Sequence, residues 1–237
     1  MRYIRDTTGR FPTRPYYEAD ELDQECERII TKFMQERCGG LIMPIPTDVL
    51  TKLIERDAED LDLYADLSAE GSDVQGVTDF YPGQKPRVRI AEELSQDRYE
   101  HRQRTTLSHE YGHVWFHKAL WDHQVLSRPL FPDVAHGASP KCKREGILGA
   151  PMSDWMEWQA GYVCGALLMP RGILKELVAH FVEQQQLFCP LNVASAHAAM
   201  LANTVAIHFD VSQEAARTRL LKLRYLTNAQ VSSPLFG

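Results

Sequence analysis

The spacing of apolar residues predicts helices over most of the chain and a short strand-rich stretch in its first half. Apolar side chains recur every three or four residues over 18–37 and again after Thr47, as they do on helices with one buried face. Residues 74–80 and 87–91 flank a turn that contains proline and glycine, which favours a β-hairpin. Acidic residues crowd 55–73, and we interpret them as a solvated face rather than a recognition surface for a basic partner.

Helical spacing also dominates the second half of the chain. It predicts helices over about 97–118, 154–169 and 171–186, followed by two more between 192 and 226. Prolines and glycines recur through 121–151, so we expect a long loop there. Loops of this length are uncommon unless they carry a function or flex.

The order of these elements, strands first and then mainly helices, indicates an α+β fold without βαβ alternation. We expect residues 1–186 to form one domain, with a small antiparallel sheet and a helix that bears the candidate site. Residues 187–237 are expected to form a helical C-terminal region with a segment similar to a helix-turn-helix.

Composition narrows the class of protein. The 237 residues are 44% hydrophobic and 24% charged, which is typical of a globular chain, and the net charge of −6 offers no overall basic field to nucleic acid or anionic lipid. No apolar run approaches the roughly 18 residues of a membrane span, and the first residues lack the apolar stretch of a secretory signal. We therefore expect no membrane contact. The five cysteines are widely spaced without a CxxC pair, which favours a reducing cytoplasm.

The strongest chemical signal is the run His109-Glu110-Tyr111-Gly112-His113. Two histidines four residues apart lie one helical turn apart on the same face, so both imidazoles can bind one metal ion. Glu110 lies about 100° around the helix, beside the metal, where its carboxylate can accept a proton from water. An apolar stripe on the opposite side, formed by Leu107, Tyr111 and Val114, would let this helix pack into a core.

Two histidines leave a catalytic zinc site one protein ligand short. The longer metzincin motif is excluded, because Phe116 and Ala119 stand where that motif needs a glycine and a histidine. His117 follows His113 by one turn but lies about 80° around the helix from His109. We expect His117 to support the ligands or simply to pack.

Glu157 is the stronger candidate for the third ligand. Small side chains share its face of the expected helix and would let that helix approach another closely: Ala160, Gly161 and Cys164. One alternative stays open at this point. Asp154 and Glu157 also fit a capping box, in which Glu157 would only accept a hydrogen bond from a backbone amide.

Two motifs together resemble a known family. The run from Arg104 to His113, followed by the run from Glu157 to Ala160 and by Leu167-Leu168-Met169-Pro170, is similar to the ImmA/IrrE family of bacterial metallopeptidases. The resemblance implies a zincin-like fold, metal ligation by His109, His113 and Glu157, and Glu110 as the catalytic base. It also implies a zinc-dependent endopeptidase that cuts a helix-turn-helix transcriptional repressor in stress or mobile-element regulation.

Zinc is the expected metal, and manganese remains an alternative because ligand type narrows the metal without choosing it. Zinc lowers the pKa of water from about 15.7 to about 7. Glu110 would accept the proton and pass it to the departing amine. Tyr162 and His208 are candidates for a further oxyanion donor. A substrate strand could add antiparallel to the sheet that contains residues 87–91.

Cys142 lies in the expected long loop between Lys141 and Lys143. Nearby positive charge lowers the pKa of a thiol, and a thiolate there could cap the metal. A free thiol without that role is the simpler interpretation.

The last expected helix carries four basic residues against Glu214, and these could contact DNA phosphates: Arg217, Arg219, Lys222 and Arg224. The apolar residues among them favour packing or contact with a partner protein instead. Two functions therefore stand beside the peptidase. One is a non-catalytic regulator that binds DNA or a repressor, and the other is a component of a toxin–antitoxin or phage-defence pair.

Overall fold

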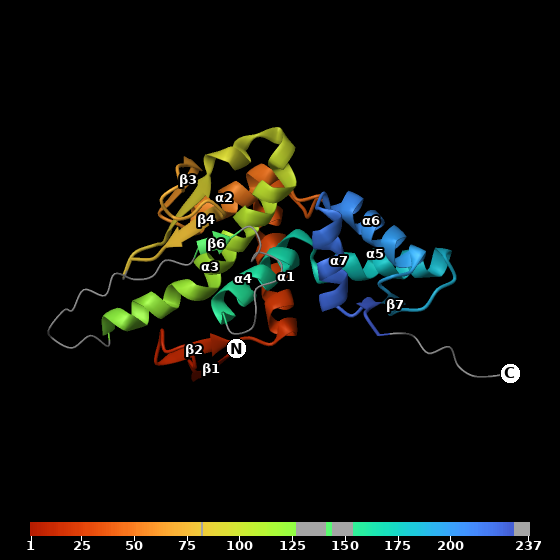
Figure 1. The fold of residues 1–237 in the computed structure, drawn as a ribbon, viewed down its shortest axis with the longest axis horizontal. Helices are drawn as coiled ribbons and strands as arrows, with labels where there is room; N and C mark the ends of the chain where they lie inside the picture. Colours follow the sequence, from red (N-terminus) through yellow and green to blue (C-terminus); the bar gives the residue numbers. More distant parts are fainter. Residues whose placement is uncertain (82, 127–140, 144–153, 230–237) are drawn as a thin grey trace. The chain divides into compact units, whose positions relative to one another are not determined.

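The computed structural model describes residues 1–81, 83–126, 141–143 and 154–229, and for 122–126 and 141–143 only the backbone (Figure 1). The chain divides into two compact units, Met1–Leu168 and Met169–Gly237. The helix that follows Pro170 falls in the second of these units, whereas the prediction from sequence placed it in a first domain of residues 1–186. Both helices and strands are present, so the α+β class is confirmed.

The first unit contains the sheet and the candidate site. Its elements are β1 (Arg2–Arg5), β2 (Thr13–Tyr16), α1 (Ala19–Cys38), α2 (Thr47–Asp57), β3 (Asp60–Ala65), β4 (Val74–Asp79), β5 (Arg87–Ala91), two 3₁₀ turns (Glu92–Ser95 and Asp97–Tyr99), α3 (Glu100–Leu126), β6 (Lys141–Lys143) and α4 (Trp155–Leu168). The predicted helices are all present. The predicted loop over 121–151 begins with the end of α3 and includes β6, and its remainder lies outside the described residues.

The main sheet has the strand order β3-β5-β4-β6 among the described residues. β4 and β5 form the predicted antiparallel hairpin, with Val77 opposite Arg89. β6 adds antiparallel to β4, but β3 pairs parallel with β5, so the expectation of an antiparallel sheet is wrong for this strand. β3 lies inside the acidic segment 55–73, which was interpreted as a solvated face. Exposed and partly buried side chains alternate along Asp60–Ala65, as they do on a strand with one buried side.

Helix α3 is the central element for the site, since it packs against α4, α2 and β4. Gly112 explains how closely α3 and α4 approach. A Cβ atom added to Gly112 would lie 3.0 Å from the Cα of Ala160, so only a glycine fits at this crossing without a shift. The close approach that the small residues after Glu157 predicted is therefore present.

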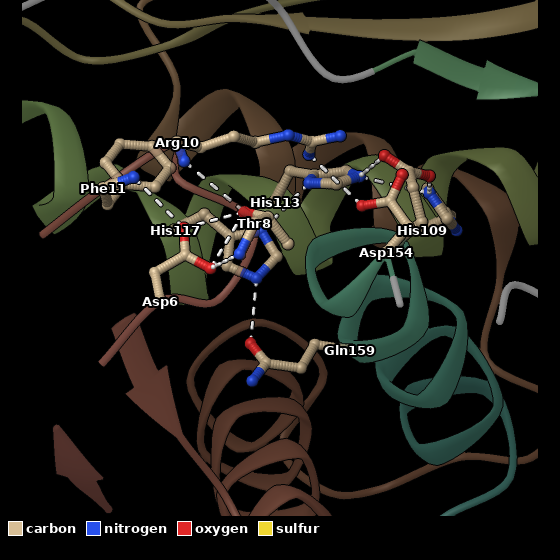
Figure 2. A network of polar contacts seen from close by, with 10 residues as sticks. Asp6, Thr8, Arg10, Phe11, His109, His113, His117, Asp154 and Gln159 are labelled. Carbon is tan, nitrogen blue, oxygen red and sulfur yellow. Dashed lines mark hydrogen bonds and ion pairs between the residues drawn. The ribbon is translucent and has the colours of Figure 1, made fainter. Parts of the chain in front are cut away.

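The N-terminal hairpin β1–β2 is held to the ends of α3 and α4 by aromatic packing. Phe11 meets the rings of Trp121 and Trp155 edge-on, and Phe80 stacks on Trp121 at 3.9 Å. Asp6 shapes the turn of the hairpin by accepting hydrogen bonds from the backbone amides of Thr8 and Phe11 (Figure 2). This packing matters for the site, because β2 also supplies a backbone acceptor to α4.

The second unit contains α5 (Arg171–Gln184), β7 (Leu191–Asn192), α6 (Ala196–Phe209), α7 (Gln213–Lys222) and β8 (Leu226–Thr227). Helices α6 and α7 follow each other in the chain and pack together. Asp210, in the left-handed conformation with φ 51°, ends α6, and the hydroxyl of Ser212 caps α7. No described helix combines the length and the apolar character that crossing a membrane requires.

The four basic residues that could contact DNA phosphates do not all lie on the surface. Arg219 is 1% exposed, and its guanidinium donates to the carbonyl of Met169 at 3.2 and 3.3 Å. Burial therefore removes Arg219 from the predicted DNA-contacting group. Arg217 and Arg224 are exposed and Lys222 is partly exposed.

Candidate metal centre

Helix α3 buries the polar face that the sequence pattern predicts. The side chains of His109, Glu110 and His113 are all 0% exposed. On another side of the helix, Tyr111 donates its hydroxyl hydrogen to Asp57 at 2.8 Å and accepts from Arg56 at 3.2 Å. The helix is thus anchored to α2 while its histidines face elsewhere.

Three potential ligand side chains converge from α3 and α4. Nε2 of His109 and Nε2 of His113 lie 3.2 Å apart. Oε2 of Glu157 lies 3.0 Å from the first nitrogen, and its Oε1 lies 3.3 Å from the second. Ligands placed tetrahedrally around zinc at 2.0–2.1 Å would lie about 3.3 Å from one another. Within the described residues these three form a group able to hold a metal ion. The donor set and its spacing therefore fit zinc.

The position of Glu157 resolves the alternative that the sequence left open. Its carboxylate contacts the two imidazoles rather than the backbone amides at the start of its own helix. Glu157 and His109 are 48 residues apart in the sequence. Burial by itself would raise the pKa of Glu157, but His113 and His109 outweigh burial and hold this pKa below its ordinary value. The carboxylate thus stays ionised, as a metal ligand must. It is also the partly open member of the group, at 16% exposed.

Glu110 is held by strand β4. The hydroxyl of Thr78 donates to Oε2 of Glu110 at 2.5 Å. Opposite Oε1, Gly76 leaves the space that the carboxylate occupies, because a Cβ atom there would lie 2.5 Å from Oε1. Glu110 therefore sits between α3 and the sheet in one defined orientation. It follows His109 in sequence but is not among the three converging side chains.

His117 lies behind His113 instead of joining the ligand group (Figure 2). Its Nδ1 is 2.9 Å from Nδ1 of His113, and its Nε2 is 3.0 Å from Oε1 of Gln159. Burial lowers the pKa of His117 to about 3, and the neighbouring His113 acts in the same direction. His117 is thus a neutral imidazole in contact with His113, outside the three converging side chains.

The predicted oxyanion donors do not join this group. Tyr162 uses its hydroxyl on α1, where it donates to Asp23 at 2.8 Å, so this candidate is withdrawn. His208 is an exposed residue of α6 in the second unit, and its predicted role stays a prediction. For Cys142 the structure describes only the backbone, which pairs with Gly76, so the predicted thiolate cap lies outside the described residues.

Three residues of the site were missed at the sequence level: Gly76, Thr78 and Gln159. Gln159 had a readable signal, since it is an amide in an otherwise apolar, buried stretch of α4. Thr78 and Gly76 gave a weaker one, because polar and small residues in a short buried strand have several structural explanations. Their contact with Glu110 depends on the packing of β4 on α3.

Two comparisons with known proteins identify no family for this chain. Neither a scan against protein-family models nor a search of curated proteins finds a match to this chain. The resemblance of the two motifs to a metallopeptidase family stays an expectation, and the geometry of the site is the independent observation.

Proposed function

We propose that this chain is a zinc-dependent endopeptidase. The observation that carries the proposal is the convergence of His109, His113 and Glu157 from two helices, with the imidazole nitrogens 3.2 Å apart and each within 3.0–3.3 Å of one of the two carboxylate oxygens. This donor set suits zinc. Three protein ligands leave a fourth position for water or substrate, which is typical of catalytic rather than structural zinc. Manganese would find the same donors, although a set with two imidazoles suits zinc well.

A bound zinc ion would supply Lewis-acid chemistry, by acidifying water and polarising the peptide carbonyl. The remaining steps belong to the chain. Glu110 accepts the proton of the attacking water and later delivers it to the departing amine. Thr78 donates to Oε2 of Glu110, which fixes the carboxylate and leaves Oε1 as the oxygen for proton transfer. Burial of Glu110 strengthens these electrostatic interactions, because bulk water does not screen them.

The zincin-like character and the target of cleavage are parts of the same proposal. The resemblance of the two motifs to ImmA/IrrE metallopeptidases supports a zincin-like core, and a motif-bearing helix packed beside a small sheet is compatible with one. The same resemblance supports a helix-turn-helix repressor as the substrate.

The experiment compares the native chain with Glu110→Gln. Each is purified and its zinc content is measured. Each is also co-expressed with any helix-turn-helix protein that a gene next to its own encodes. We expect one zinc per chain in both, cleavage by the native chain and none by the variant. Glu55→Gln, a substitution of an exposed glutamate on α2, is the matched control and should cleave normally. Equal cleavage by native and Glu110→Gln proteins would contradict the mechanism, and a native chain without zinc would contradict the metal centre.

A further inference from the structure

A series of polar contacts runs from His113 through His117 and Gln159 to the backbone of the N-terminal hairpin. Figure 2 shows it as far as Gln159. Nδ1 of His113 meets Nδ1 of His117 at 2.9 Å, and Nε2 of His117 meets Oε1 of Gln159 at 3.0 Å. The amide nitrogen of Gln159 then donates to the carbonyl of Pro15 at 3.2 Å. The three side chains are at most 1% exposed, so their hydrogen-bonding needs are met inside the protein.

The carbonyl of Pro15 decides which atom donates and which accepts at each of these contacts. A carbonyl only accepts, so the nitrogen of Gln159 must face it and the oxygen of Gln159 must face His117. Nε2 of His117 therefore carries the hydrogen, and its Nδ1 is an acceptor. His113 must then donate from Nδ1, which leaves a lone pair on Nε2, the atom that points at His109 and Glu157.

The reverse direction is excluded by the same carbonyl. It would require Nε2 of His117 to accept from the nitrogen of Gln159, which turns the oxygen of Gln159 toward Pro15. Two acceptors would then face each other at 3.2 Å. Pro15 has no backbone N–H, so this residue of β2 has no hydrogen to offer in exchange.

We propose that His117 and Gln159 are positioning residues, which hold His113 in the tautomer and orientation that present Nε2 to the metal. This inference rests on the proposed metal centre. Neither residue touches the metal; each acts through the next. The other imidazole lacks such support, since Nδ1 of His109 has no hydrogen-bond partner among the described residues. The hydrogen-bonded partners of metal-ligating histidines commonly tune metal affinity in this way.

The tautomers can be read directly. Long-range nitrogen–proton correlation spectra of protein labelled with ¹⁵N-histidine, assigned with His117→Gln, distinguish a hydrogen on Nδ1 from one on Nε2. We expect His117 to carry its hydrogen on Nε2 with and without zinc, and His113 to carry its hydrogen on Nδ1 in the zinc-loaded protein. A His117 hydrogen on Nδ1 would overturn the proposal.

Metal affinity provides the second readout. Gln159→Leu removes the acceptor for His117, and we expect it to raise the Kd for zinc about 10- to 100-fold and to change the visible spectrum of the cobalt-loaded protein. Gln159→Glu keeps an oxygen facing His117 but sets its second oxygen against the carbonyl of Pro15, so we expect a Kd between those of the native protein and Gln159→Leu. Leu167→Ala, buried in the same helix but outside the contact chain, should lose stability and keep the Kd within about twofold. A folded Gln159→Leu protein with native affinity and spectrum would refute the positioning role.

Failure of this inference is separable from failure of the proposed function. A native chain that binds no zinc contradicts the metal centre, while the tautomer of His117 in the zinc-free protein still tests the contact chain. A native chain that binds zinc without cutting protein contradicts the peptidase alone.

Discussion

Buried polar groups serve different purposes in the two units of this protein. In the first unit, His109, His113 and Glu157 point their polar atoms at one another and form a group that could hold a metal ion. In the second unit, the buried guanidinium of Arg219 is directed at a backbone carbonyl of its own unit. The sequence suggested a function for both groups, metal binding for the first and DNA contact for Arg219.

The difference lies in where the polar atoms point. A buried donor that meets an acceptor is a structural hydrogen bond. Several buried acceptors that converge repel one another unless a proton or metal ion lies between them. Convergence of acceptor atoms, rather than burial of charge as such, is therefore the better sign of a metal centre. Substitutions at the site in the first unit should change metal binding or cleavage, whereas substitution of Arg219 in the second unit should change stability alone.

The largest effect is expected for Glu157→Ala. Removing one of three protein ligands should cost about 3 kcal/mol or more of zinc binding, which is roughly a hundredfold or more in Kd. Competition against a chelator of known affinity measures it. Unchanged zinc affinity would mean that the carboxylate of α4 is not a ligand.

Gly76→Ala should come next, because the added Cβ atom would lie 2.5 Å from Oε1 of Glu110 and must displace it. A displacement of about 1 Å can lower a catalytic rate about 100-fold. Zinc content should stay at the native level, since Gly76 contacts none of the ligands. Gly40→Ala is the control: a Cβ atom there meets nothing within 4 Å. Native cleavage by Gly76→Ala would show that Glu110 tolerates movement.

Arg219→Met should act on stability alone. Leaving the carbonyl of Met169 without this donor should cost about 1–3 kcal/mol in the free energy of unfolding of the second unit. Chemical denaturation followed by hydrogen exchange of α7 would measure the loss, with zinc affinity as the second readout. Arg217→Met, at an exposed position of the same helix, should change stability by less than about 0.5 kcal/mol. A loss of zinc affinity in Arg219→Met would remove the contrast between the units.

The smallest effect concerns pH. The pKa of His117 is lowered to about 3 in the folded protein, whereas an unfolded chain binds a proton at this imidazole near pH 6.5. Between these values the unfolded state holds more protons, so stability is complete above about pH 6.5 and falls as pH is lowered, by at most about 1.4 kcal/mol per pH unit. Unfolding of zinc-free protein from pH 7.5 to 5.5 should show a shallower pH dependence for His117→Gln than for the native chain. Identical slopes would contradict a neutral, buried His117.

Much of the fold could be predicted from local patterns. The helices followed from apolar spacing, and the β4–β5 hairpin followed from a turn between two strand-like runs. β3 was missed because its acidic residues read as a solvated face, although they lie on an exposed edge of the sheet. Its parallel pairing with β5 joins segments far apart in the chain, and no local spacing predicts such a register.

The sequence by itself determined that His109 and His113 lie one turn apart on a single helical face, because the period of the α-helix is a local property of the backbone. It also suggested Glu157, but could not separate a metal ligand from a helix cap. Only the tertiary structure brought the carboxylate of Glu157 to the two imidazoles, placed Thr78 and Gly76 around Glu110, and formed the series of contacts from His113 to Pro15. Those contacts depend on how closely α3 approaches α4 and the sheet, which is a result of packing the whole unit rather than of any one segment.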